Sequence, residues 1–261
     1  MRYKDMEIIK NTDIKRKALI IYCTDTSSGE LSGPTADNCA IRSYLKSDTG
    51  GKWYDDEIIS LHNPNVEEVK YTIKTGFVGV DYSFVVFSGH GCIFKDNNLQ
   101  YIEVIDGDIA LSNLITAAPR QTLVIDACRG YFSGPLTERM IKSFSVQTSS
   151  SDIRRTFNKA VMEAEKGLSI LYSASEDESS VDTSKGGAYI YSLVHVCKKW
   201  GSNPDNGNYL LDVREAHIRA SKYMKNNFIT LQNPEMNMEK RCRYFPIAVN
   251  ETKRIMNNVK H

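Results

Sequence analysis

The sequence has no apolar run approaching about 18 residues, so no segment is long enough to cross a bilayer as a helix. It also lacks an excess of charge of either sign, with 33 basic and 32 acidic residues, which argues against a surface for nucleic acid or an anionic membrane. Residues 1–17 are polar and charged and do not have the pattern of a secretory signal. We therefore expect a cytoplasmic protein that binds neither nucleic acid nor membranes.

Cysteine is sparse and has no recognisable framework. The six cysteines are spread along the chain, without the spacing of a metal site or of a disulfide-rich domain. In a chain without a secretory signal they should be reduced thiols. No metal is therefore expected from the cysteines.

The length of 261 residues, with 41% hydrophobic and 25% charged residues, suits a soluble α/β protein. Short apolar runs at 17–22, 58–61, 84–88, 123–126 and 168–174 predict strands, and helical patterns at 34–46 and 65–75 separate the first three. This order predicts a mostly parallel sheet with right-handed crossovers. Further helices are predicted at 108–117, 153–165 and 209–226, and a last strand at 244–249.

The stretch 123–130 (Leu-Val-Ile-Asp-Ala-Cys-Arg-Gly) predicts a buried strand that ends in a turn presenting Cys128. In open α/β sheets, ligands bind at the carboxyl ends of the strands. A cysteine placed there is held by the strand and reachable from solvent, as a nucleophile must be. Free cysteine is also among the most buried residue types, so this stretch alone leaves a packing role open.

A second stretch, 84–91 (Phe-Val-Val-Phe-Ser-Gly-His-Gly), has the same form and presents His90 between two glycines. If the two strands are neighbours in a parallel sheet, His90 and Cys128 face each other at one edge. A free thiol has a pKa near ~8.5 and is mostly protonated at neutral pH, and a nearby imidazole can take its proton. The backbone N–H groups of Gly91 and Cys128 could then bind an oxyanion.

These Ser-Gly-His-Gly and Asp-Ala-Cys-Arg-Gly turns resemble those of the caspase-like cysteine peptidases, which include caspases, paracaspases and metacaspases. The resemblance runs from about residue 17 to residue 249. It implies a caspase-like α/β fold with a mostly parallel central sheet of about six strands, flanked by helices, in one peptidase domain over residues 1–261. Residues 17–132 would form a large-subunit-like half with His90 and Cys128, 133–155 a mobile linker, and 156–250 a small-subunit-like half.

The resemblance also bears on the substrate, because the residue two positions before the cysteine lies in the primary specificity pocket of this family. Caspases have glutamine there, whereas metacaspases and paracaspases have an acid and accept a basic side chain. This sequence has Asp126. Asp37, in a paracaspase-like setting, and Asp182, placed by its spacing from Tyr172, are carried over as further pocket acids; the alternative is that these two are solvated surface residues.

Three carboxylates around one slot repel each other unless a cation enters, so they would select arginine or lysine. The planar guanidinium group can bridge two carboxylates, which favours arginine. Metacaspases often bind calcium through an acidic cluster after the histidine strand, but residues 106–113 lack the expected pair of aspartates, and no calcium is carried over. No other metal and no cofactor are expected.

The leading hypothesis is a cysteine endopeptidase that cleaves protein or peptide substrates after Arg, and less well after Lys, through a thioester acyl-enzyme. The alternative is a non-catalytic caspase-like module that binds a partner or a small signalling ligand at the same edge. The presence of both His90 and Cys128 argues against that alternative. A flavodoxin-like nucleotide binder fails because no glycine-rich phosphate turn follows the first predicted strand.

The Ser-rich segment 143–152 predicts a mobile loop where caspases have the linker between their subunits. Its basic neighbours Lys142, Arg154 and Arg155 make self-processing a hypothesis, with an ordinary connector as the alternative. Some short members of the family act in cell-death or immune responses. A protease of this kind requires control, by an activating partner, a small ligand or self-cleavage.

Overall fold

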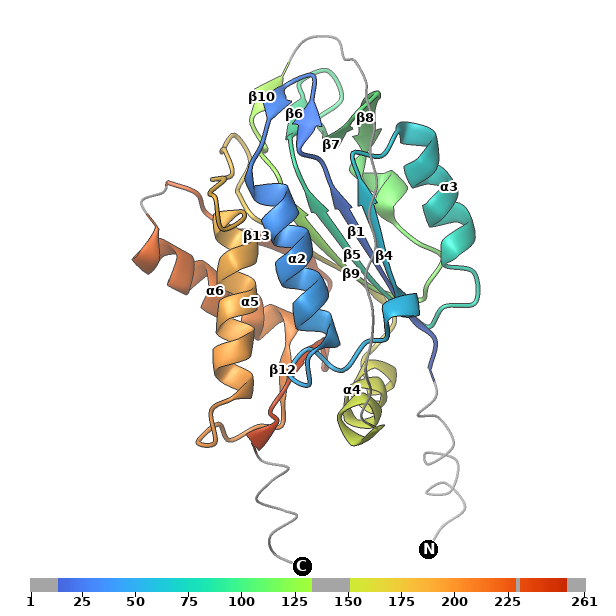
Figure 1. Ribbon diagram of the computed structural model, residues 1–261, viewed down its shortest axis with the longest axis vertical. Helices are drawn as coiled ribbons and strands as arrows, with labels where there is room; N and C mark the ends of the chain where they lie inside the picture. Colours follow the sequence, from blue (N-terminus) through green and yellow to red (C-terminus); the bar gives the residue numbers. More distant parts are fainter. Residues whose placement is uncertain (1–13, 133–150, 229–230, 253–261) are drawn as a thin grey trace, which may run out of the picture.

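A mostly parallel sheet forms the centre of the structure (Figure 1). The computed structural model describes residues 14–132, 151–228 and 231–252. The parallel strands are β1 (Arg16–Tyr22), β4 (Ile58–His62), β5 (Tyr82–Ser88), β9 (Arg120–Asp126) and β11 (Gly167–Tyr172). β13 (Glu235–Met238) pairs antiparallel with β11, which gives the strand order β13-β11-β9-β5-β1-β4. The predicted six-stranded, mostly parallel sheet is confirmed.

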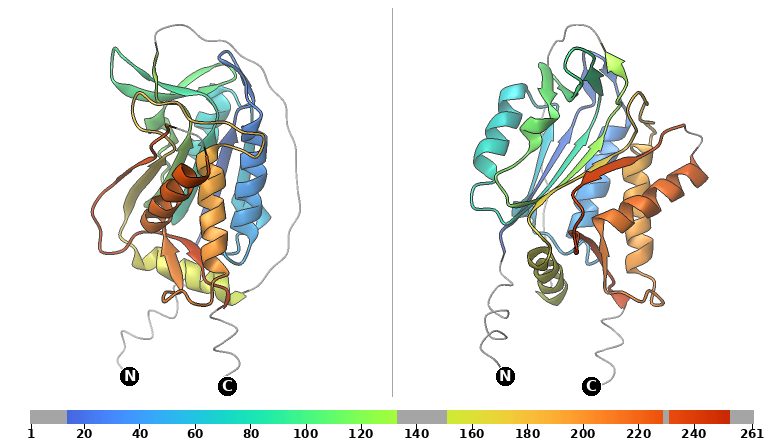
Figure 2. Two further views of the ribbon diagram at one scale, coloured as in Figure 1. Left: turned by 90° about the vertical axis from the view of Figure 1, so that its left-hand side faces the viewer. Right: turned by 180° about the vertical axis from the view of Figure 1, so that it is seen from behind.

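Both faces of this sheet are covered by helices or loops. As a consequence, β5 and β9 are buried at every position. Successive side chains of β1 enter two separate hydrophobic clusters, one on each face. α2 (Gly33–Lys46), α4 (Ser151–Glu163), α5 (Ala188–Gly201) and α6 (Val213–Asn227) contribute to one cluster, and α3 (Val66–Gly76) to the other (Figures 1 and 2). None of the helices in the described segments is long and apolar enough to span a membrane.

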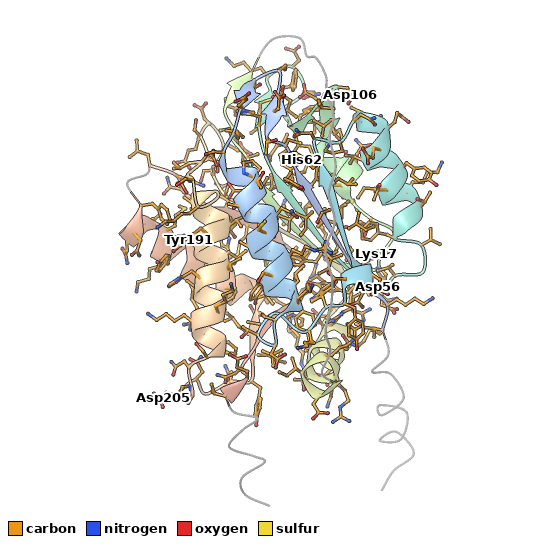
Figure 3. All side chains as sticks on the ribbon, viewed as in Figure 1. Lys17, Asp56, His62, Asp106, Tyr191 and Asp205 are labelled. Carbon is orange, nitrogen blue, oxygen red and sulfur yellow. The ribbon has the colours of Figure 1, made fainter. Side chains whose placement is uncertain are left out.

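The carboxyl ends of the strands meet a second, smaller sheet. In Figure 3, Lys17 at the start of β1 and His62 at the end of β4 mark the lower and upper ends of the main sheet. Above the upper end lie β6 (Gly91–Phe94), β7 (Leu99–Val104), β8 (Gly107–Ala110) and β10 (Tyr131–Phe132), in the order β10-β6-β7-β8. The chain leaving β5 enters this sheet through β6, and the chain leaving β9 enters it through β10.

The helix predicted at 108–117 is wrong. The segment forms β8 and then a short 3-10 turn, Leu111–Leu114. An Ile105-Asp106 turn brings Gly107 opposite Val104, and the burial of β8 alternates from residue to residue as in a half-buried strand. The pairing with β7 therefore decided the structure of a segment whose apolar residues are also compatible with a helix.

The C-terminal half also differs from the prediction at two places. The predicted helix 209–226 is preceded by a strand, β12 (Leu210–Asp212), and begins only at Val213, where the Asp212 side chain accepts a hydrogen bond from Glu215 N at 2.9 Å. The predicted last strand forms as β14 (Pro246–Val249), but it pairs with β12 rather than with the main sheet. One edge strand of the main sheet is β13, which was not predicted.

Most of the predicted linker, residues 133–150, lies outside the described residues. Its last five residues, 151–155, form the first turn of α4. The Arg154 guanidinium is paired with both oxygens of Glu57, at 2.7 Å and 2.5 Å, and stacks 4.0 Å from the centre of the Tyr54 ring. Arg154 is therefore part of the folded body rather than of a free loop.

Candidate active site

The two predicted catalytic turns lie side by side because β5 and β9 are paired in register. Ser88 stands opposite Asp126 at the ends of these strands, so His90 and Cys128, each two residues further on, occupy equivalent positions. Gly89 N–H donates to the Asp126 carbonyl at 3.2 Å and joins the two turns. Beyond the turns, β6 and β10 pair with each other. The fold thus brings the histidine and the cysteine to one edge.

His90 and Cys128 open onto one pocket with a volume of about 60 Å³. All three predicted acids line the same pocket. The lining residues besides His90 and Cys128 are Leu31, Pro34, Asp37, Ser88, Gly89, Asp126, Ser180, Val181, Asp182 and Gly187. A larger cavity of about 350 Å³ lies beside Arg129, but neither His90 nor Cys128 lines it. Five of the six predicted site residues therefore line the smaller pocket, and Gly91 does not.

The His90 ring is held by a short hairpin formed by β2 (Asp25–Thr26) and β3 (Gly29–Glu30). Its Nε2 lies 3.2 Å from the Gly29 carbonyl oxygen, and because a carbonyl only accepts, this contact places the ring proton on Nε2 and leaves Nδ1 free to accept. The hairpin is itself fixed by Glu103, which accepts hydrogen bonds from the Ser27 hydroxyl and from Ser28 N. Glu103 N–H donates to the His90 carbonyl at 3.0 Å. One residue of β7 thus supports both the histidine and its partner.

Cys128 is half-buried, and its sulfur accepts a hydrogen bond from Ser180 N–H at 3.3 Å. All six cysteines are free. Burial raises the pKa of the Cys92 thiol to about 11 and that of Cys197 to about 12, and both remain protonated at neutral pH. Cys128 is the cysteine that shares a pocket with a histidine, as a nucleophile requires.

Gly91 lies against the cysteine turn. A Cβ atom at this position would stand 2.9 Å from Ala127 Cβ and 3.2 Å from the Cys128 carbonyl oxygen, which is too close for any other residue without a shift of the backbone. Gly91 therefore permits β6 to pass directly beside Cys128. Its role in binding an oxyanion stays a prediction.

Asp126 is 4% exposed, and its carboxylate faces the beginning of α5. Oδ2 accepts from Ile190 N at 3.2 Å, and Oδ1 accepts from the Ser180 hydroxyl. A Cβ atom on Gly187 would stand 2.2 Å from Oδ2, so a glycine is needed for this approach. Because the N-terminus of a helix favours negative charge, α5 offsets part of the cost of burying this carboxylate.

Asp37 is 1% exposed and reaches the same end of α5 from the middle of α2. Gly187 N–H donates to both of its oxygens, at 3.0 Å and 3.1 Å, and the Ser88 hydroxyl donates to Oδ2 at 2.7 Å. Asp37 is therefore not a solvated surface acid. Its burial removes that alternative.

Asp182 is exposed, but its carboxylate is also fixed. Oδ2 accepts from Ser32 N and Gly33 N, both at 3.1 Å, at the beginning of α2. The acid thus stands over a second helix N-terminus at the mouth of the pocket. The three acids come from three distant parts of the chain and face one space.

Three carboxyl groups line the pocket, and none of them is paired with a cation among the described residues. Burial and the neighbouring Asp126 raise the pKa of Asp37 well above its usual range, and burial also raises the pKa of Asp126. In the described part of the chain, no Lys, Arg or His forms a salt bridge with Asp37, Asp126 or Asp182. Within the same segments, no group of three or more His, Cys, Asp or Glu side chains is arranged to hold a metal ion.

The raised pKa of Asp37 has a consequence for stability. The folded protein keeps this proton over a pH range in which the unfolded chain releases it. The stability that the proton contributes is therefore fully present below the usual pKa of an aspartate, and it is lost as pH rises through the raised pKa of Asp37. We expect Asp37→Asn to gain stability relative to the wild type between pH 4 and pH 8, on the order of 1 kcal/mol or more. Urea unfolding of both proteins across this range would measure it, and a difference that does not grow with pH would contradict the expectation.

Sequence reasoning missed three residues of the site. Ser88 could have been found, because it precedes the Gly-His-Gly turn and its partner Asp37 was already a candidate. Gly29 and Ser180 lie in a short hairpin and in irregular chain, where no periodicity marks a residue. Their contacts with His90 and Cys128 are visible only in three dimensions.

Comparisons with known proteins agree with this geometry. Residues 15–245 match the sequence model of the caspase domain. No curated protein matches the sequence. Among solved structures, the crystal structure of caspase-1 from Spodoptera frugiperda is similar, with a TM-score of 0.60 and 15% sequence identity over 87% of this chain and 90% of that chain. At this identity the structural similarity bears on the fold alone, and it confirms the predicted caspase-like architecture.

Proposed function

The chain belongs to the caspase domain family of cysteine peptidases, and we propose that it cleaves proteins after arginine, with lysine as a weaker second choice. One observation carries the proposal: three carboxyl groups, which form no salt bridge with the described part of the chain, line the same pocket as Cys128 and His90. Such a pocket attracts a cation and repels an acidic side chain. A role in cell death or defence, and control by a partner or ligand, stay predictions from the resemblance.

In the proposed reaction, His90 Nδ1 takes the proton of Cys128, and the thiolate attacks the carbonyl carbon of the residue before the cleaved bond. The Gly29 carbonyl keeps the other ring proton on Nε2. The N–H groups of Gly91 and Cys128 stabilise the oxyanion of the tetrahedral intermediate. The imidazolium then gives its proton to the leaving amine, and a water molecule, activated by the same imidazole, hydrolyses the thioester.

Arginine suits the pocket better than lysine for a geometric reason. A guanidinium group has five N–H donors in one plane and can bond to Asp126 and Asp37 together, whereas an ammonium group is a compact point charge. Charge-assisted hydrogen bonds to carboxylates are about twice as strong as neutral ones. The buried acids therefore set the preference for a basic side chain, and the exposed Asp182 adds a weaker attraction at the mouth.

The proposal is tested by digesting an unfolded protein substrate and identifying every new C-terminus by mass spectrometry. We expect arginine at most of the new ends, lysine at a minority, and no cleavage with Cys128→Ala. New ends without a basic preference would show that the three acids do not form the specificity pocket. A wild-type protein that cleaves nothing, alone or after limited proteolysis, would favour the non-catalytic binding module.

The structure narrows the prediction of self-processing. A peptide must be extended to enter a protease cleft, but Arg154 lies in α4 with its side chain paired to Glu57, and Arg155 lies in the same helix. We therefore expect any self-cleavage of the active protein after Lys142 or Arg139, and none after Arg154 or Arg155. Intact-mass measurement on the active protein, with Cys128→Ala as the uncut control, checks this. A fragment that begins at residue 155 or 156 would contradict it.

A further inference from the structure

Ser180 contacts both the nucleophile and a buried pocket acid. Its main-chain N–H donates to Cys128 Sγ at 3.3 Å, and the thiol lies 3.9 Å from the Ser180 carbonyl oxygen, toward which it can donate. The Ser180 hydroxyl donates to Asp126 Oδ1. A hydroxyl has a single proton to donate, so that of Ser180 is committed to Asp126. One residue thus connects the catalytic side of the pocket with its specificity side.

The acceptor side of the Ser180 hydroxyl is also occupied. It accepts from the Ser173 hydroxyl at 3.1 Å and from Gln232 Nε2 at 3.3 Å. The buried Gln232 side chain, in turn, accepts from Val181 N at 3.1 Å. Ser180 therefore has a defined position in the structure, and this position depends on Asp126.

The chain around Ser180 is able to shift without loss of a helix or strand. Residues 173–187, between β11 and α5, contain only one isolated bridge, from Ser184 to Gly186. The segment is anchored on either side of Ser180: the Glu178 carbonyl accepts from Arg129 N at 2.8 Å, and Val181, whose N–H donates to Gln232, accepts from Ala188 N at 2.9 Å. Between these anchors, the Ser180 main chain contacts Cys128, and the Ser180 hydroxyl contacts Asp126 and its neighbours.

A cation entering the pocket competes directly with Ser180. Oδ1 of Asp126 holds the Ser180 hydroxyl, and Oδ2 holds the N–H of Ile190, which is fixed in α5. The pocket has a volume of about 60 Å³, close to that of a guanidinium group, and Ser180 lines it, so a guanidinium group that bonds to Asp126 lies against the Ser180 hydroxyl. A charge-assisted bond is about twice as strong as the neutral hydroxyl bond that it replaces. Ser180 is therefore the residue that yields.

We infer that Ser180 couples the specificity pocket to the nucleophile: a cation that binds Asp126 displaces the Ser180 hydroxyl, and the resulting shift of Ser180 releases the Cys128 thiol to His90. This inference rests on the proposed function, because it assumes that a basic side chain occupies the pocket. In the structure the thiol is engaged with the Ser180 main chain. Once released, its proton passes to His90 Nδ1 and the electron pair of the S–H bond stays on sulfur. A substrate with a neutral side chain at this position would therefore bind weakly and would also leave the Cys128 thiol engaged with Ser180.

The test uses n-butylguanidinium as the cation and n-butylurea as a neutral compound of the same shape. We would measure alkylation of Cys128 in the full chain by iodoacetamide, resolved by residue with mass spectrometry, at constant ionic strength. Butylguanidinium should raise the rate saturably, by about five-fold or more, the equivalent of one hydrogen bond. Butylurea should leave the alkylation rate of Cys128 unchanged. Cys39, an exposed cysteine on α2, is the internal reference, and neither compound should change its alkylation rate.

Two variants and a binding measurement complete the test. Ser180→Ala should react at about the saturated wild-type rate without any cation, whereas Ser179→Ala, its exposed neighbour, should behave as the wild type. Binding of butylguanidinium is followed by the rise in melting temperature. If it binds and the Cys128 rate is unchanged or lower, the coupling is wrong while the basic-residue pocket stands. If it does not bind, the coupling and the proposed specificity both fall. If Ser180→Ala does not fold, the titration of wild-type Cys128 reactivity with butylguanidinium is sufficient to test the coupling.

Discussion

Replacing Cys128 with alanine should abolish peptide cleavage, and replacing His90 with alanine should do nearly the same. Removing one member of a nucleophile–base pair costs about 10³-fold or more in comparable enzymes, because the remaining member has no partner for the proton transfer. Both residues lie in turns at the ends of strands rather than in the core, so the fold should survive. The measurement is kcat/KM for a fluorogenic peptide that ends in arginine.

Matched controls separate catalysis from general damage. Cys39→Ala removes an exposed thiol from α2, and His195→Ala removes an imidazole from α5. Both should retain nearly full activity. A Cys128 or His90 variant that keeps more than a few per cent of wild-type activity would remove that residue from the mechanism.

Asp126→Asn should lower kcat/KM for arginine peptides by about 10²-fold or more, because a guanidinium group taken out of water then loses its charged partner. Asp37→Asn should cost less than Asp126→Asn, because the raised pKa of Asp37 opposes the ionisation that pairing with a guanidinium group requires. Asp182→Asn should cost less, because water screens an exposed carboxylate. Cleavage after lysine should fall in parallel, and Cys128 should still react with iodoacetamide in every variant.

The matched control for these three variants is Asp205→Asn. Asp205 is exposed and lies at the lower corner of the molecule in Figure 3, at the opposite end from the pocket. It should leave arginine cleavage unchanged. A loss in Asp205→Asn equal to that in Asp126→Asn would mean that net charge, rather than the pocket, sets the rate.

The turns that present His90 and Cys128 could be predicted from the sequence because the signals for them are local. In each, an apolar run predicts a strand, and glycines beside the functional residue predict a turn. Parallel pairing then places equivalent turns at one edge. The proposed role of Asp126 could be predicted only from the family resemblance, because no chemical rule identifies the residue two positions before a cysteine as a pocket residue.

Other parts of the structure could not be predicted because they depend on long-range pairing. β13 has only four residues, and Met236 and Met238 are its only apolar residues, which is too short an alternating pattern to predict a strand. β8 has residues compatible with a helix and becomes a strand because β7 is available beside it. Ser180 enters the site through a loop whose position is set by Gln232 and Asp126, both remote in sequence.

The most direct test of the account compares two substrates in the wild-type protein, identical except that one has arginine and the other citrulline before the cleaved bond. Citrulline has nearly the shape of arginine without the charge, so the ratio of kcat/KM isolates the attraction of the three acids for a cation. The account predicts that arginine is preferred by about 10²-fold or more. Equal turnover of the two peptides, or a preference for aspartate over both, would contradict it.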